Sequence, residues 1–257
     1  MEEVRNEGPI VSDPPQMSEV STIANIFFEP GRVFEDLRRK PRFIMGSILI
    51  AVLFTAYIFG LTTKVGEAGI RRAVLEQLER SPQGSSMSQE QKEDAVSINL
   101  TIQKYTRFAM PIFVFLSLLL GGLFYFLAAK AFGGNGGFLH GLSVWVYSSI
   151  PPTVIAMIAN FLVLMLKSAD EIDLTASQRG VIHANAGFLL NGKEMPVLTT
   201  IVSTLDLFMI WGWILAAIGL RITNRLSSGS AWAAVIIIGL IGVLFRVVGA
   251  FLSGNPS

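Results

Sequence analysis

The chain has 257 residues, of which 51% are hydrophobic and only 15% charged, with a mean hydropathy of +0.55. Soluble domains carry about a quarter charged residues, so this composition predicts an integral membrane protein. A net charge of +1 leaves no basic surplus for a phosphate backbone, which argues against nucleic acid as a partner. The absence of cysteine excludes disulfide bonds, thiolate metal sites and a cysteine nucleophile.

The N-terminal segment precedes any apolar span and divides into two parts. Residues 1–20 are polar and contain prolines, and we expect a disordered cytoplasmic tail without a cleavable signal sequence. Residues 21–42 predict two short amphipathic helices, with Ser21 as an N-cap and Pro30 separating them. Apolar side chains beside a basic end are typical of helices that lie on the cytoplasmic surface of a membrane.

Long apolar stretches dominate the rest of the chain. A membrane-spanning helix needs about 20 mostly apolar residues, and the windows that qualify are Phe43–Leu61, Phe108–Ala129, Leu142–Leu166, Val197–Leu220 and Ala231–Leu252. The outer loops would be 62–107 and 167–196, and the first of them carries helical patterns of its own. The sequence therefore predicts an all-α fold: a polytopic bundle of five transmembrane helices over residues 43–252, with a small helical extracytoplasmic cap.

Basic residues set the expected orientation. Arg38, Arg39, Lys40 and Arg42 directly precede the first span. Because Lys and Arg near the first span favour the cytoplasmic side, we expect a cytoplasmic N-terminus. With five spans, the C-terminus would then lie outside.

The third span contains two adjacent prolines, Pro151 and Pro152, which remove two backbone donors and predict a kink. The hydroxyl groups of Ser148 and Ser149 are placed to satisfy the freed backbone groups. One interpretation is a static kink that shapes the bundle. The other is a broken helix that lines a substrate path.

The fourth span carries an acidic residue, Asp206, whose insertion into a membrane costs roughly 2.5–3.5 kcal/mol. Thr199, Ser203 and Asp206 fall at helical spacing and predict one polar stripe. Arg246 is the only basic residue within any predicted span. Since the two charges would differ in depth by only ~5 Å, we predict an Asp206–Arg246 ion pair between spans four and five. A proton-coupled or ion-coupled transport role for Asp206 is the alternative.

The fifth span also carries small residues on the face of Arg246. Such residues let membrane helices approach closely. This predicted packing stripe consists of Gly239, Gly242 and Gly249.

No catalytic or metal-binding pattern stands out in the sequence. The two histidines, His140 and His183, would lie on opposite sides of the membrane, and no HExxH spacing occurs. The glycine-rich segment 132–141 lacks the GK[ST] ending of a phosphate-binding loop. We therefore expect no catalytic residues, no metal and no cofactor.

Four stretches taken together resemble the Yip1 domain family of small multi-span membrane proteins, particularly its bacterial members. They are IANIFFEPGRVFEDLRRKPRF before the first span, FGGNGGFLHGLSVWVYSSIPP around the third, STLDLFMIWGWILAAIGL in the fourth and SSGSAWAAVIII opening the fifth. The resemblance covers most of residues 21–252, and the two outer loops match nothing in it.

The resemblance implies a five-span helical protein of a bacterial cytoplasmic membrane with its N-terminus inside. Eukaryotic relatives are adaptors for Rab-type GTPases and vesicle-forming machinery, and some bacterial relatives look like accessory partners of ABC-type exporters. It carries over no catalytic residue, and it puts Tyr147, Pro151, Asp206 and Trp211 at characteristic positions. We therefore expect a membrane scaffold or adaptor whose partners are the bilayer and another membrane protein, either transporter subunits or itself. A small permease or ion-coupled carrier is the alternative.

Overall fold

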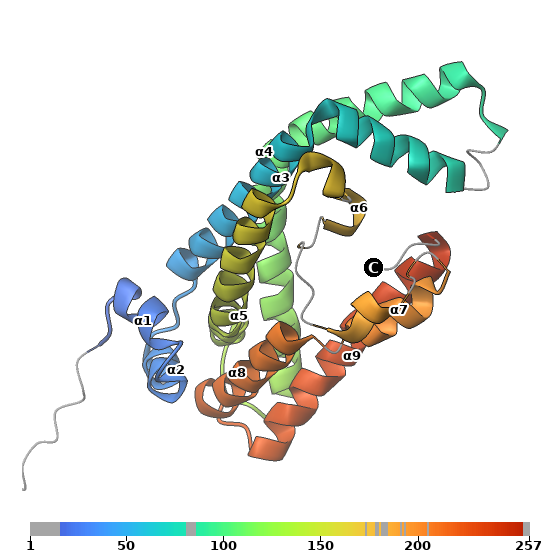
Figure 1. Cartoon of the computed structure of the whole chain (residues 1–257). Coiled ribbons are helices and arrows are strands. Elements are labelled where there is room, and N and C mark those ends of the chain that lie inside the picture. The colour runs from blue at the N-terminus through green and yellow to red at the C-terminus, as the bar shows by residue number, and fades with distance from the viewer. Residues whose placement is uncertain are drawn as a thin grey trace, which may run out of the picture.

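The computed structural model describes residues 16–80, 86–172, 174–177, 180, 185–190, 192, 194–204 and 206–253. Within these ranges all regular structure is helical, which confirms the predicted all-α class (Figure 1). The elements are α1 (Glu19–Asn25), α2 (Pro30–Arg39), α3 (Ile44–Arg80), α4 (Gln89–Ala131), α5 (Phe138–Leu166), the 3₁₀ turn η2 (Ala169–Glu171), α6 (Leu174–Ser177), the 3₁₀ turn η3 (Ala186–Leu189), α7 (Pro196–Ser203), α8 (Leu207–Thr223) and α9 (Ser228–Ser253).

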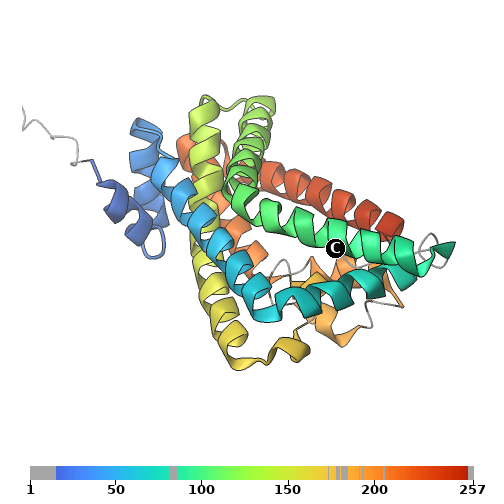
Figure 2. The same ribbon diagram turned by 90° about the horizontal axis from the view of Figure 1, so that it is seen from above.

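Among the described residues, four helices are long and apolar enough to cross a membrane: α3, α4, α5 and α9. The helices α7 and α8 have 8 and 17 residues, so each is too short to span a membrane alone; taken together they form a further span that is bent by 47°. The protein is therefore a multi-pass membrane protein with four or five spans. α3, α4 and α5 lie side by side, and Figure 2 shows α9 running beside α4.

Helices α3 and α4 continue well beyond the expected spans. They contain 37 and 43 residues, but α3 consists of two helical segments that meet in a kink at Gly66, where φ is 66°. At 1.5 Å per residue, α4 is about 65 Å long against a hydrocarbon core of about 30 Å. A capping box between Ser88 and Gln91 starts α4, and an ion pair joins Arg71 of α3 to Glu93 of α4. The helical patterns predicted in the loop 62–107 are thus extensions of two spans, and they protrude as an antiparallel pair (Figure 1).

The buried apolar residues form two clusters along the bundle. One cluster joins α1 and α2 to the nearby ends of α4, α5, α8 and α9, and includes Phe34, Leu142 and Leu220. We call this the N-terminal end of the bundle. The other cluster joins α3, the first part of α4, the last part of α5 and α6, and includes Tyr57 and Val96.

Helix α5 runs as one helix through Pro151 and Pro152. The hydroxyl groups of Ser148 and Ser149 both donate to the Trp145 carbonyl, at 3.1 and 2.8 Å. They therefore do not bond the carbonyls of residues 147 and 148 that the prolines release, as the sequence had suggested. A serine hydroxyl in a helix reaches the carbonyl three or four residues before it, and from these two positions that carbonyl is residue 145.

Candidate functional site

The first two helices form a compact hairpin at the N-terminal end. Helix α1 is capped by Ser18, whose hydroxyl accepts the Ser21 backbone N–H at 3.1 Å, so the N-cap expected at Ser21 is wrong by three residues. Pro30 is the first residue of α2, as predicted, where its missing N–H costs no hydrogen bond.

The apolar face of this hairpin packs against the bundle. Ile26, Val33, Phe34 and Leu37 have no exposed surface, and α2 contacts α8 and α5. Burial of such side chains contributes on the order of 1.5–3 kcal/mol each. The expectation that this stripe lies on the membrane surface is therefore wrong. The bundle itself offers a complementary apolar surface, and so the stripe is already covered.

Gly219 of α8 makes this close approach possible. A Cβ atom at that position would lie 2.7 Å from Val144 Cγ1 and 2.8 Å from Phe34 Cε1. Real Cβ atoms do not come that close to a neighbour, so any larger residue would push α2 or α5 away. The glycine thus sets the position of the hairpin.

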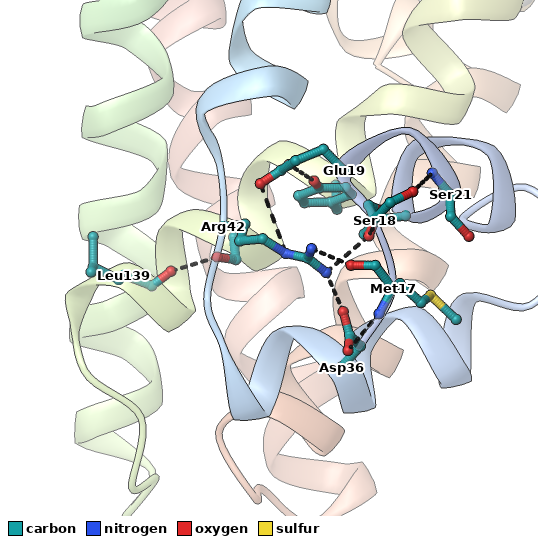
Figure 3. A network of polar contacts seen from close by, with 10 residues as sticks. Met17, Ser18, Glu19, Ser21, Asp36, Arg42 and Leu139 are labelled. Atoms are coloured by element: carbon teal, nitrogen blue, oxygen red, sulfur yellow. Dashed lines mark hydrogen bonds and ion pairs between the residues drawn. The ribbon is translucent and has the colours of Figure 1, made fainter. Parts of the chain in front are cut away.

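A buried ion-pair cluster fastens the hairpin to the start of α3 (Figure 3). The Arg42 guanidinium donates to the Asp36 carboxylate, to the Met17 carbonyl at 2.5 Å and to the Thr22 hydroxyl at 2.9 Å. The carboxylate of Glu19 lies 4.0 Å from Arg42 Nε. One arginine thereby holds α1, α2 and the segment that precedes α1.

Burial makes this cluster different from a surface ion pair. The side chain of Asp36 is 2% exposed and that of Arg42 is 10% exposed. The second Asp36 oxygen accepts the Met17 backbone N–H at 3.3 Å, and the Tyr147 hydroxyl of α5 donates to Glu19 at 3.4 Å. In such surroundings each charge depends on its partner, because an unpaired buried charge costs several kcal/mol.

The loop between α4 and α5, together with the first turn of α5, contacts the ends of α2 and α8. His140 Nδ1 accepts the Gly137 N–H at 3.2 Å, so Nε2 carries the proton and donates to the Arg38 carbonyl at 3.1 Å. The Asn135 N–H also donates to the Asn224 carbonyl beyond α8, at 3.0 Å. The glycine-rich segment is therefore a structural connector. It bonds to a backbone carbonyl in the last turn of α2 and to the carbonyl of the residue that follows α8.

Sequence reasoning took Arg42 as one of several basic residues before the first span and gave Asp36 and Glu19 no role. A signal was present in the sequence. Asp36 lies between Phe34 and Leu37 on the apolar face of a predicted helix, and an acid in that position calls for a basic partner.

The fourth predicted span is interrupted at its acidic residue, so its expected continuity over Val197–Leu220 is wrong. Thr199 and Ser203 belong to α7, whereas Asp206 is the N-cap of α8 and accepts the Phe208 N–H at 2.8 Å. Its other oxygen accepts from the Asn185 side-chain amide at 3.2 Å. A short carboxylate that bonds the backbone two residues later favours a helix start over a helix interior. The three residues are therefore not a stripe on a single helix.

The remaining predicted residues lie on α9. A Cβ atom at Gly239 would lie 2.3 Å from the Trp213 ring, so α8 and α9 meet closely there. In the described part of the chain, nothing lies within 4 Å of a Cβ placed at Gly242, and Gly249 is half-buried. Arg246 lies on α9, which packs against both α7 and α8, and its pairing with Asp206 stays a prediction.

The described residues contain no group of three or more His, Asp or Glu side chains that could hold a metal ion. His183 lies outside the described residues. The Arg42 cluster has the features of a structural lock: a cation that bonds to a carboxylate, a hydroxyl group and a backbone carbonyl, with a second carboxylate 4.0 Å from its Nε.

Comparison with known proteins places the chain in a family. Residues 24–249 match the Yip1 domain, so the chain belongs to the Yip1 domain family. It is also similar to the membrane protein YknW of Bacillus subtilis, with 24% identity over 240 residues that cover 92% of this chain and 93% of the relative. No solved structure matches.

Proposed function

We propose that this member of the Yip1 domain family is a non-enzymatic membrane scaffold, or adaptor, that binds another membrane complex, with an ABC-type exporter as the first partner to test. The support comes from the N-terminal hairpin. It is locked to the bundle through Arg42 and Gly219, so it presents its outer surface in a fixed geometry. A preorganised surface binds a partner at a lower entropic cost than a mobile one.

The outer surface of the hairpin carries exposed apolar side chains, and this observation carries the proposal. Val20 is 71% exposed and Phe28 is 83% exposed, and Ala24 between them is exposed as well. Val20 and Ala24 lie one turn apart on α1, and Phe28 lies in the turn that follows the helix; we call these three exposed residues the ridge. Glu29, which follows the ridge, is exposed too. An exposed apolar ridge beside charged residues is typical of a protein-binding surface.

The test is affinity purification from native membranes in a mild detergent, with bound proteins identified by mass spectrometry. The wild-type chain should recover transporter subunits or another membrane complex in stoichiometric amounts. The ridge variant F28E should lose that complex, because the glutamate would have to be desolvated at the interface. The control E35Q alters an exposed residue elsewhere on the hairpin and should recover the same complex.

Recovery of the chain alone, or only with itself, would refute an adaptor for another complex. Equal recovery by F28E and E35Q would refute the ridge as the contact surface.

The orientation in the membrane needs a separate test. Because the chain has no cysteine, single-cysteine variants at Glu35 and Glu90 can be labelled from either side of the membrane. We propose that Glu35 is labelled from the cytoplasm of a bacterial cell and Glu90 from outside.

A small permease is the second candidate, and the break between α7 and α8 is the observation that favours it. Discontinuous helices with polar groups at the break often form substrate sites in carriers. Here Asp206 and Asn185 meet at the start of α8. Flux through vesicles reconstituted with the wild type, but lost in a folded D206N variant, would favour this function over the scaffold.

A further inference from the structure

A groove lies between α8 and α9 at the N-terminal end of the bundle. It is a shallow groove, half open to the surroundings, with about 70 Å³ of space for molecules the size of water. The second half of α8 forms one wall of the groove, and the first turns of α9 form the other. The lining residues are Ile214, Ala217, Ile218, Arg221, Ser228 and Trp232.

The groove is apolar along its length and basic at one end. Ile214 is 42% exposed and Trp232 is 39% exposed, so both side chains are open to the surroundings of the bundle. Arg221 lies in the last turn of α8, and no described side chain or backbone group forms a hydrogen bond or ion pair with its guanidinium. A cation at the end of an apolar groove is suited to an amphipathic ligand, with an anionic group at one end and an apolar chain attached to it.

The start of α9 adds positive potential near Arg221, which opposes the negative potential at the end of α8 where Arg221 lies. The Ser227 hydroxyl accepts the Ser230 N–H at 3.1 Å, which satisfies one of the donors at the start of α9. The N–H groups of the two residues between them have no partner within the helix, and they add positive potential beside Arg221. A Cβ atom at Gly229 would meet no described atom within 4 Å, so this side of the groove is open.

From this arrangement we propose that the groove binds one anionic phospholipid. Its phosphate headgroup pairs with Arg221 at the end of the two helices. One acyl chain lies along Ile214 and Ile218, against the Trp232 ring. The charge of Arg221 selects an anionic headgroup. The position of the groove against α9, which is long enough to span a membrane, favours a lipid over a soluble phosphate. A tryptophan one turn inside a helix end is typical of the headgroup level of a bilayer.

Native mass spectrometry of the purified protein tests the proposal. The probes are dioleoyl phosphatidylglycerol and dioleoyl phosphatidylcholine, added at equal concentration. The wild type should retain the anionic lipid preferentially, and R221Q should bind it about fivefold more weakly, the effect expected for one basic residue near an anionic lipid. R221K should retain most of the binding. The matched control R38Q removes an exposed charge at the same end of the bundle and should bind as the wild type does.

A second variant tests the groove independently of the charge. I214W keeps Arg221 and fills the space for the acyl chain, and it should also lose the anionic lipid. If R221Q does not fold, lipid binding by I214W alone decides whether the groove is the binding site. The proposal is overturned if R221Q and R38Q bind alike, if both lipids bind the wild type equally, if I214W binds normally, or if inorganic phosphate displaces the lipid at matched concentration.

Discussion

The two ends of the bundle are built from different kinds of contact. At the N-terminal end, segments far apart in sequence meet: His140 bonds to Arg38, 102 positions away, and Tyr147 bonds to Glu19, 128 positions away. At the opposite end, α3 and α4 protrude as a pair of neighbouring helices, and their ion pair joins Arg71 to Glu93. One end is fixed by contacts among several distant segments, whereas the protruding turns of α3 and α4 are held mainly by the packing of these two neighbouring helices.

Burial of the ion pairs makes the same contrast quantitative. Arg42 and Asp36 are 10% and 2% exposed, whereas Arg71 and Glu93 are 47% and 51% exposed. Removing one partner of a buried pair costs about 3–5 kcal/mol, but an exposed pair contributes about 0–1 kcal/mol. Pairs of the same chemistry should therefore differ severalfold in their effect on stability.

The largest effect is expected from R42A. The substitution leaves the Asp36 carboxylate buried without its cation and removes the bonds to Met17 and Thr22. We expect the hairpin to lose about 3 kcal/mol or more, so amide exchange in α1 and α2 should accelerate roughly 100-fold. Hydrogen exchange with mass spectrometry measures this region directly.

Two controls interpret that result. R38A removes an exposed arginine of α2 and should change exchange little. The double variant D36L/R42M replaces both charges with apolar groups and should recover much of the loss, since no unpaired charge remains. Slow exchange in R42A would show that the apolar contacts alone hold the hairpin.

A smaller effect is expected from a matched pair of glycines. G219A places a methyl group 2.7–2.9 Å from Val144 and Phe34, and such overpacking costs about 1–3 kcal/mol. G242A adds the same methyl group on α9 where no described atom is near, so it should stabilise the helix by about 0.5–1 kcal/mol. Opposite shifts in the unfolding temperature in detergent are expected. A similar shift in both variants would mean that Gly219 does not set the docking distance.

The sequence was sufficient for the membrane helices and insufficient for their contacts. Apolar windows located α3, α4, α5 and α9 because about 20 apolar residues in a row have few other stable structures. The ion-pair cluster could not be placed, since the pairing of Arg42 with Asp36 depends on how the hairpin folds back. Asp206 was judged by its depth in an unbroken helix, but its ability to cap a helix is what the fold uses. The lipid groove depends on the angle between α8 and α9, which no local pattern encodes.

Two substitutions separate the two roles of Asp206, capping of α8 and the predicted ion pair with Arg246. D206A removes the cap of α8, and we expect a loss of about 1 kcal/mol. D206N keeps an equally good cap and should be within a few tenths of a kcal/mol of the wild type if capping is the whole role. The unfolding temperature in detergent measures both variants. If D206N is as unstable as D206A and the exchanged pair D206R/R246D restores stability, the predicted ion pair with Arg246 is supported. If R246A has no effect, that ion pair is wrong.

The smallest effect is expected at the protruding end. R71A breaks the exposed pair with Glu93, and we expect a loss of about 0.2–1 kcal/mol, observed as faster amide exchange in the outer turns of α3 and α4. Raising the salt concentration from about 0.1 to 1 M shortens the screening length from about 10 to 3 Å, so it should remove most of the difference between R71A and the wild type. The same salt change should leave the difference between R42A and the wild type almost intact, because water and ions do not reach the buried pair. If salt reduced both differences equally, the two ends would not differ in burial as the structure indicates.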